Sequence, residues 1–212
     1  MAKSEDSEIF LQIADYYSAR LAQYGASARG VDWNSEESQL LRFEQLIKVI
    51  ARTDSFSLTD LGCGYGALYD FLRSRYPCFS YTGCDVSAAM IAAAQARNSS
   101  AVNTRYVLSS EPPEVADYGI ASGIFNVRLT RSDSEWRSSV EATLDAMNRT
   151  SRCGFSFNCL TTYSDVDKMR GDLYYADPCR IFDYCKRRYS RHVALLHDYG
   201  LYEFTILVRR EV

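Results

Sequence analysis

The stretch FSLTDLGCGYG, residues 56–66, decides the fold. It begins as a short apolar run with β-branched and aromatic members, and it then places glycine at Gly62, Gly64 and Gly66. A run of this length bounded by glycine predicts a buried strand. The next stretch, residues 67–75, carries its apolar residues at helical spacing. The order is therefore strand, glycine loop and helix, and a loop without Cβ atoms lets the backbone approach a ligand closely.

An acidic residue ends the second predicted strand. That strand is FSYTGC at residues 79–84, and Asp85 follows it directly. In a βαβ unit, an acid at this place accepts hydrogen bonds from ribose hydroxyls. Strand, glycines, helix, strand and acid together indicate a nucleoside-binding half-fold, and this context favours it over the alternative of glycines in an ordinary turn.

The glycine spacing resembles that of one family. A dinucleotide fingerprint is G-x-G-x-x-G, whereas here Asp60 stands two positions before the glycines of residues 62–66. The pattern DLGCGYG matches every fixed position of D/E-x-G-x-G-x-G, the first motif of the class I, Rossmann-like S-adenosylmethionine-dependent methyltransferases. The resemblance extends from about Gln39 to Arg210. It implies a three-layer α/β sandwich, with a seven-stranded, mostly parallel sheet and an antiparallel final strand, and S-adenosyl-L-methionine as cofactor.

The composition fits this class. The chain has 212 residues, of which 47% are hydrophobic and 24% charged, with a net charge of −3 and no lysine-arginine run. These values argue against a nucleic-acid surface. No window reaches the roughly 18 apolar residues of a membrane helix, and we see no signal peptide. The seven cysteines are scattered without a C-x-x-C pair. We therefore expect reduced thiols, no metal site and a cytoplasmic protein.

The chain is expected to divide into an N-terminal helical lid, residues 1–34, and a methyltransferase domain, residues 35–212. In the resembled class a helix and loop such as residues 5–33 often close over the cofactor. The other helices are expected at residues 36–52, 88–97, 133–148 and from 178 onward. Further strands are expected at residues 104–108, 118–124, 154–160, 191–196 and 202–209, the last two as a hairpin.

The resemblance also implies the cofactor-binding residues. Aromatic side chains of the lid are candidates to face the cofactor, although they are equally suited to packing the lid on the domain. Arg42 could bind the cofactor carboxylate bidentately or be a solvated helix arginine. Val86 and Met90 would flank the adenine, with serines in place of the usual acid after the third strand. The full set is Tyr17, Trp33, Arg42, Asp60, Gly62, Cys63, Gly64, Asp85, Val86, Met90, Ser109, Ser110, Gly123 and Asn126.

The acceptor side is expected at the carboxyl ends of the later strands. Residues 122–125 read SGIF and lack the N/D-P-P-Y/F of enzymes that methylate amines of nucleic acids and glutamine. The polar segment 161–176 and the hairpin link 197–201 leave the same edge as the glycine loop, so their side chains are candidates for the substrate. The predicted substrate-binding residues are Tyr163, Tyr174, Tyr175 and His197, with His197 also as a catalytic base or, alternatively, a residue that ties the hairpin link to the body.

The sequence therefore predicts transfer of a methyl group from S-adenosylmethionine to an oxygen or nitrogen of a small-molecule acceptor. No nucleic-acid or membrane partner is expected, and the oligomeric state is not predicted. Two alternatives remain open at this point. One is a non-catalytic S-adenosylmethionine-binding protein, and the other is a nicotinamide-dependent oxidoreductase, which the glycine spacing and the final antiparallel hairpin disfavour.

Overall fold

The computed structural model describes residues 2–52 and 54–210, and the side chains from residue 8 onward. Its helices are α1 (Ala2–Tyr24), η1 (Ala28–Val31), α2 (Glu36–Leu46), η2 (Ile47–Val49), α3 (Ala67–Arg73), α4 (Ala88–Arg97), α5 (Asp133–Thr150), η3 (Val166–Lys168) and α6 (Pro178–Arg188). Its strands are β1 (Phe56–Leu61), β2 (Phe79–Asp85), β3 (Thr104–Leu108), β4 (Ala116–Ala121), β5 (Ser151–Thr161), β6 (Tyr175–Ala176), β7 (His192–Leu196) and β8 (Glu203–Arg209).

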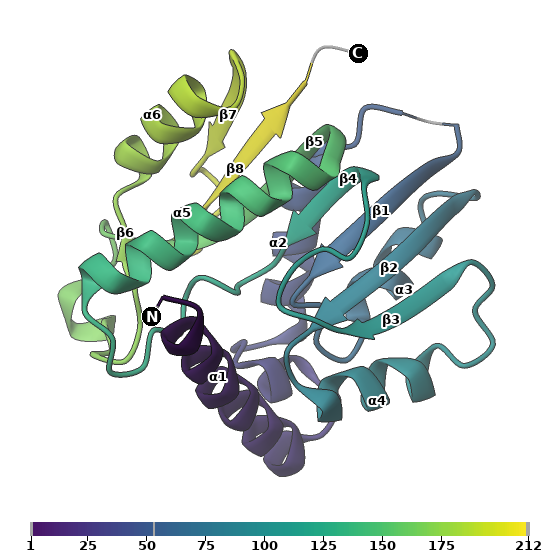
Figure 1. Cartoon of the computed structure of the whole chain (residues 1–212), viewed down its shortest axis with the longest axis horizontal. Coiled ribbons are helices and arrows are strands. Elements are labelled where there is room, and N and C mark those ends of the chain that lie inside the picture. Colours follow the sequence, from purple (N-terminus) through teal and green to yellow (C-terminus); the bar gives the residue numbers. More distant parts are fainter. Residues whose placement is uncertain (1, 53, 211–212) are drawn as a thin grey trace.

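The strands form one mixed sheet in the order β3-β2-β1-β4-β5-β8-β7, with β6 paired to the end of β5 (Figure 1). The pairs from β3 to β5 are parallel, and β8 runs antiparallel to both β5 and β7. The predicted Rossmann-like sheet is confirmed. The short β6 is an addition, since the sequence predicts only a loop there and a two-residue strand leaves no periodic pattern to recognise.

Two apolar cores hold the helices on the sheet. One face of the sheet packs against α2 and α3, through residues such as Leu58, Tyr81 and Ile120. The other face packs against α5 and α6, through residues such as Phe155 and Phe157. Both faces are apolar because successive side chains of a strand point to opposite faces of the sheet. Three layers result, as the class predicts.

Side-chain caps define the starts of the helices. Ser35 caps α2 and Asp177 caps α6, and Ser132 caps α5 in a reciprocal capping box with Glu135. Helix α2 stops short of the predicted end at residue 52, because the chain passes through the short η2 and is extended at Ile50. Strand β4 ends at Ala121, short of the predicted end at residue 124, because Gly123 has a φ of 77° and cannot continue a strand.

The topology brings several strand ends to one edge of the sheet. Since β1, β2, β3 and β4 are parallel, their carboxyl ends meet at that edge, where α/β proteins of this kind bind ligands. Helix α1 lies across this edge in Figure 1, beside α4 and below the end of β1. Its side chain Ser18 is hydrogen-bonded to Ser87 at 2.9 Å between their hydroxyl oxygens, which fixes α1 against the start of α4.

Candidate active site

The glycine loop, residues 62–66, turns sharply at the end of β1. Gly62 and Gly64 have φ values of 76° and 52°, in the left-handed region that a side chain disfavours. The backbone N–H groups of Gly62 and Cys63 both donate to the carbonyl oxygen of Cys84, at 2.7 and 2.9 Å. The loop is therefore bound by its own backbone to the end of β2.

Asp85 joins this loop to the next helix. One carboxylate oxygen accepts the N–H of Gly64 at 2.9 Å, and the other accepts the N–H of Ser87 at 2.9 Å. The residue is buried, and burial raises the pKa of its carboxyl group although the backbone donors oppose this shift. Each carboxylate oxygen has a second lone pair for a ligand hydroxyl, so the predicted ribose contact fits this geometry.

Asp60 is a second buried acid behind the loop. The hydroxyl of Tyr81 donates to its carboxylate at 2.6 Å. Burial is the largest cause that raises the pKa of Asp60, to about 7, and the neighbouring Asp85 adds to it. Two acids at this place favour a cationic ligand, because a positive charge would relieve the cost of burying their negative charges.

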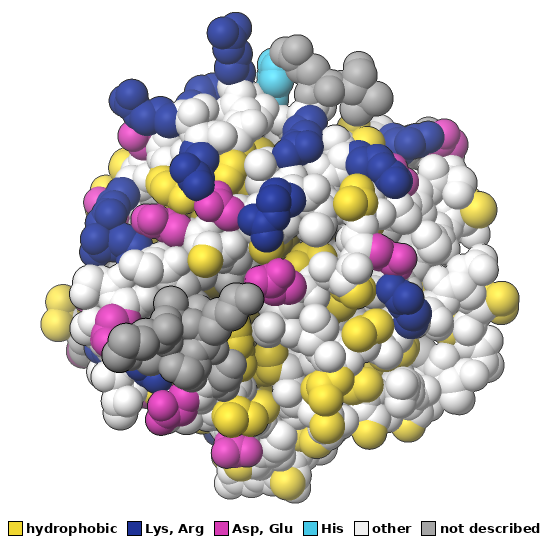
Figure 2. All heavy atoms as spheres, in the orientation of Figure 1, with side chains coloured by type: hydrophobic (Ala, Val, Ile, Leu, Met, Phe, Trp, Pro, Cys, Tyr) yellow, Lys and Arg dark blue, Asp and Glu magenta, His cyan; other side chains and the backbone are white. Residues whose placement is uncertain are grey.

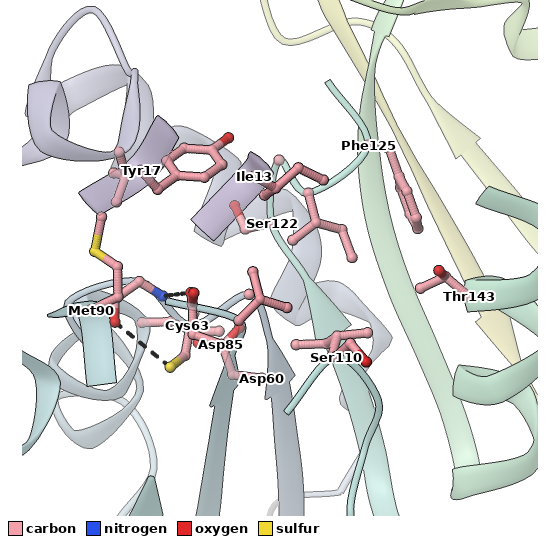
Figure 3. A pocket seen from close by; sticks show the side chains of 18 of the residues that line it. Ile13, Tyr17, Asp60, Cys63, Asp85, Met90, Ser110, Ser122, Phe125 and Thr143 are labelled. Carbon is pink, nitrogen blue, oxygen red and sulfur yellow. Dashed lines mark hydrogen bonds between the residues drawn. The ribbon is translucent and has the colours of Figure 1, made fainter. Parts of the chain in front are cut away.

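The glycine loop opens into a pocket that continues beneath α1 and α5 (Figure 3). The space between its walls is about 1050 Å³, part of it open to solvent. The glycine loop, Asp85 and Met90 lie at one end, and Phe125 and Thr143 lie at the other. The pocket therefore joins the glycine loop to side chains of α5 in one continuous lining.

We call the lining contributed by helices α1 and α5 the α1–α5 wall; it runs from Tyr17, beside Met90, to Thr143 at the second end (Figure 3). It consists of side chains that face the pocket from two helices: Phe10, Ile13, Tyr17, Trp136, Ser139, Val140 and Thr143. The four residues of α5 are spaced three, one and three positions apart, which puts them on one helical face. The indole N–H of Trp136 donates to the carbonyl of Phe125 at 2.8 Å, and this bond fixes α5 against the loop after β4.

The pocket fits S-adenosylmethionine on three observations. The left-handed glycines leave the backbone of the loop open to a ligand. Asp85 offers acceptors for ribose hydroxyls. The hydroxyl of Ser122 lies in the pocket lining and has no hydrogen-bond partner within the described residues. A buried hydroxyl without a partner is costly, so a ligand group is expected to satisfy it.

Most of the predicted cofactor-binding residues meet in this one pocket. Those that line it are Tyr17, Trp33, Asp60, Gly62, Cys63, Gly64, Asp85, Val86, Met90, Ser109, Ser110 and Gly123. Their contact with the cofactor stays a prediction, since a shared lining shows where they lie and not what they bind.

Two predicted cofactor residues do not reach the pocket lining. Arg42 is neither free for a carboxylate nor solvated, because it is buried in an ion pair with Glu203. Asn126 accepts the N–H of Leu160 through its side-chain oxygen at 3.1 Å, so it holds the loop after β4 against β5. Both side chains are bound to partners that lie far away in the sequence, and the local sequence does not reveal such partners.

The predicted substrate residues also lie outside the pocket lining. The ring of Tyr163 is 69% exposed and lies 5.8 Å from the ring of His197. Tyr174 is buried, and its N–H donates to the carbonyl of Asn126. The hydroxyl of Tyr175 accepts the N–H of Arg170.

His197 lies at the predicted carboxyl edge of the sheet, but at the end of that edge away from the glycine loop. It follows β7, the outermost strand, and β8 separates β7 from β5. The imidazole packs between the rings of Tyr163 and Phe204, whose centroids are 5.8 and 6.1 Å away. The geometry therefore gives the predicted catalytic role of His197 no support.

Sequence reasoning missed most of the α1–α5 wall. It predicted Tyr17 as a cofactor-binding residue and residues 133–148 as a helix, but it placed no side chain of that helix at a ligand. The one available signal was Ser139 and Thr143, two hydroxyl residues next to the apolar face of α5. A polar residue bordering an apolar helix face is common at the surface, so this signal does not identify a pocket without the fold.

No helix in the described part of the chain is both long and apolar enough to cross a membrane. Residues 2–52 and 54–210 hold no group of three His, Cys, Asp or Glu side chains arranged to bind a metal ion. All seven cysteines are free, and five of them are buried: Cys63, Cys84, Cys153, Cys159 and Cys185.

Fold and pocket together define the class of Rossmann-like methyltransferases, and comparison with known proteins agrees. Residues 58–154, from β1 to the start of β5, match the family model described as "Methyltransferase domain". A Mycobacterium tuberculosis (strain ATCC 25618 / H37Rv) protein named "Putative methyltransferase Rv1506c" is 58% identical over 164 residues, which cover 77% of this chain and 99% of that protein. The chain belongs to this methyltransferase family.

Solved structures show the same fold. The magnesium protoporphyrin IX methyltransferase of Synechocystis PCC 6803, solved with bound S-adenosylmethionine, aligns with a TM-score of 0.68 at 13% identity over 95% of this chain and 97% of its own. Human N-acetylserotonin methyltransferase, also solved with S-adenosylmethionine, aligns with a TM-score of 0.61 at 14% identity over 94% of this chain and 67% of its own.

These findings confirm the predicted class, an S-adenosylmethionine-dependent methyltransferase, and with it the predicted cofactor. They decide against the nicotinamide-dependent alternative.

Proposed function

We propose that the chain transfers the methyl group of S-adenosylmethionine to an oxygen or nitrogen of a small, largely uncharged acceptor bound beside the α1–α5 wall. The observation that carries this proposal is the continuity of the pocket. The glycine loop and Asp85 line one end of it, Phe125 and side chains of α5 line the other, and side chains of α1 extend between them (Figure 3). A cofactor and its acceptor would then share one site covered by α1.

The charge of the pocket supports an acceptor of this kind. Among the described residues, its lining includes Asp60 and Asp85 but no lysine, arginine or histidine. An acceptor that carries a phosphate or several carboxylates would lose its hydration there without gaining a cationic partner. An uncharged acceptor, or one with an amine, avoids this cost.

The surface supports a small molecule over a nucleic acid. Figure 2 shows lysine and arginine mostly in the upper half of the view, over α5, α6 and the strands beside them, with acidic side chains among them. The chain as a whole is acidic, with a net charge of −3. A nucleic-acid site would instead need basic side chains gathered around the pocket. Two proteins of the same fold are named for small acceptors, magnesium protoporphyrin IX and N-acetylserotonin, so the fold accommodates acceptors of this size.

The chemistry follows from orientation. When bound, S-adenosylmethionine supplies an electrophilic methyl group on a sulfonium. The residues of this chain then hold the acceptor atom in line with that group, and positioning alone can supply much of the acceleration. The wall of α1 and α5 excludes water, while Tyr17 and Ser122 bring two hydroxyl groups to the lining. The described lining holds no lysine or histidine, and its two carboxylates, Asp60 and Asp85, already accept hydrogen bonds from the protein. This favours acceptors that lose their proton without a protein base.

The proposal is tested by labelling. The purified chain is incubated with S-adenosylmethionine carrying a labelled methyl group and with a cell extract separated into small-molecule, protein and nucleic-acid fractions. We expect label in the small-molecule fraction, and none with a Gly64→Val variant. Label transferred only to protein or nucleic acid would contradict the proposal.

A further inference from the structure

A buried ion pair joins α2 to the first residue of β8. The guanidinium of Arg42 donates to both carboxylate oxygens of Glu203, with Nε–Oε2 and Nη2–Oε1 distances of 2.8 and 2.7 Å. The two side chains are only 7% and 1% exposed. Arg42 also donates from Nη1 to the carbonyl of Ser38 at 2.7 Å. Stability alone does not explain such a pair, because apolar residues of similar volume usually stabilise a core at least as well.

Hydrogen bonds connect the ion pair to the wall of the pocket. The side-chain amide of Asn158 donates to Glu203, and its oxygen accepts the backbone N–H of Gly123 at 2.8 Å. Gly123 lines the pocket just after β4. Two consecutive hydrogen bonds therefore connect a carboxylate on β8 to the backbone that forms one pocket wall.

Trp33 is held between the two ends of this connection. The guanidinium carbon of Arg42 lies 3.8 Å from the centroid of the indole ring, a cation–π contact. On the other side, a Cβ atom added to Gly123 would lie 2.4 Å from Cζ2 of the indole. The ring fills the space that a side chain at Gly123 would need. Trp33 also lines the pocket.

We propose that Arg42, Glu203 and Asn158 are positioning residues for the cofactor, which they hold in register through Trp33 and Gly123. None of the three lines the pocket itself, so each acts through the indole ring or the backbone that does. The inference rests on the cofactor use of the family and does not depend on the identity of the acceptor. The competing role is purely structural, in which the ion pair only attaches α2 to the sheet.

A double substitution separates the two roles. In Arg42→Met/Glu203→Leu, apolar side chains replace both charges, so no unpaired charge is left buried. The amide of Asn158 loses its acceptor, so the melting temperature should fall slightly while the variant stays folded. The affinity for S-adenosylhomocysteine, measured by calorimetry, should fall about tenfold, the scale of coupling between residues in contact. Unchanged affinity in this folded variant would overturn the positioning role.

A second variant decides the question should the double variant not fold. Arg42→Lys keeps the charge beside Glu203 but loses the two-pronged geometry and the flat group over the indole. In a Trp136→Phe background, Trp33 is the one remaining tryptophan of the chain, so its fluorescence reports its own surroundings. We expect a shifted emission maximum and about threefold weaker binding of S-adenosylhomocysteine. Unchanged emission and unchanged affinity would overturn the inference.

An exposed ion pair provides the control. Arg187 and Asp183 pair within α6, with side chains 78% and 58% exposed, and neither lines the pocket. Their double alanine variant should bind S-adenosylhomocysteine as the unmodified chain does. Absence of binding to the unmodified chain would overturn the cofactor assignment and this inference with it, whereas binding that is equal in all variants would overturn only the positioning role.

Discussion

The two sides of the pocket are built by different means. On the glycine-loop side, backbone N–H groups donate to Asp85 and Cys84, and these acceptors lie on the adjacent strand β2. On the α1 side, one carboxylate gathers partners from distant parts of the chain. Asp32 accepts from Tyr16 at 2.7 Å and pairs with Arg20 at 2.6 Å and with Arg170 at 3.2 Å.

The difference predicts different mechanical behaviour. Backbone hydrogen bonds inside a buried loop resist salt and local motion, so we expect the glycine loop to stay rigid. The pairs around Asp32 involve partly exposed side chains, 48% for Arg170 and 26% for Arg20. Exposed ion pairs are individually weak and are screened by salt. We therefore expect the α1 side to open and close over the fixed side, which is the lid role predicted for residues 1–34.

The largest effect is expected from Gly64→Val. The backbone there has a φ of 52°, and an added Cβ would lie 3.0 Å from Val31 at the pocket lining. Both the strained backbone and the lost space should abolish binding of S-adenosylhomocysteine, measured as the loss of its thermal stabilisation. Gly171→Val is the matched control, because nothing lies within 4 Å of an added Cβ there. Equal stabilisation of both variants by the ligand would place the cofactor elsewhere.

The next effect is a pH dependence of stability. Asp60 has its pKa raised from 3.8 to about 7, so the folded chain holds a proton that the unfolded chain releases. Its contribution to stability is complete below about pH 4 and is lost as the pH rises through 7, with an upper bound of about 4 kcal/mol.

Asp60→Asn should remove this contribution to the change of the free energy of unfolding with pH. Denaturant unfolding between about pH 4 and 8 measures it, with Asp167→Asn at an exposed carboxylate as control. A variant slope equal to that of the unmodified chain would show that Asp60 is already ionised in the folded state.

Asp85→Ala should weaken cofactor binding by roughly 1.5–3 kcal/mol, because it removes a charged acceptor for the ribose hydroxyls. It also leaves the N–H groups of Gly64 and Ser87 without their partner. Calorimetry with S-adenosylhomocysteine gives the affinity, and circular dichroism checks the fold. Full affinity in a folded variant would mean that the ribose does not lie at Asp85.

Asp32→Ala tests the α1 side. It removes the shared partner of Tyr16, Arg20 and Arg170, and we expect cofactor affinity to fall by about threefold, since each exposed pair contributes little. High salt should lower the cofactor affinity of the unmodified chain by a similar factor. It should have little effect on the affinity of the variant, because the ion pairs that salt screens are already lost there. A variant with unchanged affinity and unchanged salt dependence would leave α1 as a plain packing helix.

The smallest effect is expected from His197→Ala. The imidazole packs between Tyr163 and Phe204 at the outer edge of the sheet, so its loss should lower the melting temperature slightly and leave turnover per folded molecule nearly unchanged. Methyl transfer to the acceptor found by labelling measures this. A fall of about 10²-fold would restore the catalytic role that the sequence predicts for it.

Local patterns explain which parts of the fold were predictable. Strand β3 and helix α4 begin and end at the predicted residues, and Ser87 caps α4. Each of these features depends on neighbours in the sequence. The same holds for the glycine loop and Asp85, whose partners lie a few residues apart or on the adjacent strand.

Long-range pairing explains what was not predictable. A free Arg42 would suit a carboxylate ligand, but Glu203 occupies it from a strand 161 residues away. His197 stands at the predicted edge, yet the strand order places it at the outer end of that edge. The wall of α5 becomes part of the pocket only because α5 packs over the end of β4. Such partners are set by the tertiary fold, and the local sequence carries no trace of them.

The central claim is that the fixed glycine loop and the α1–α5 wall enclose one ligand site. Hydrogen–deuterium exchange with and without S-adenosylhomocysteine tests it most directly, because it reports protection along the whole chain in one measurement. We predict slower exchange in residues 61–66 and 84–90 together with residues 9–18 of α1 and 136–143 of α5. Protection confined to the edge formed by residues 161–176 and 192–204, or no protection on adding the ligand, would contradict the account.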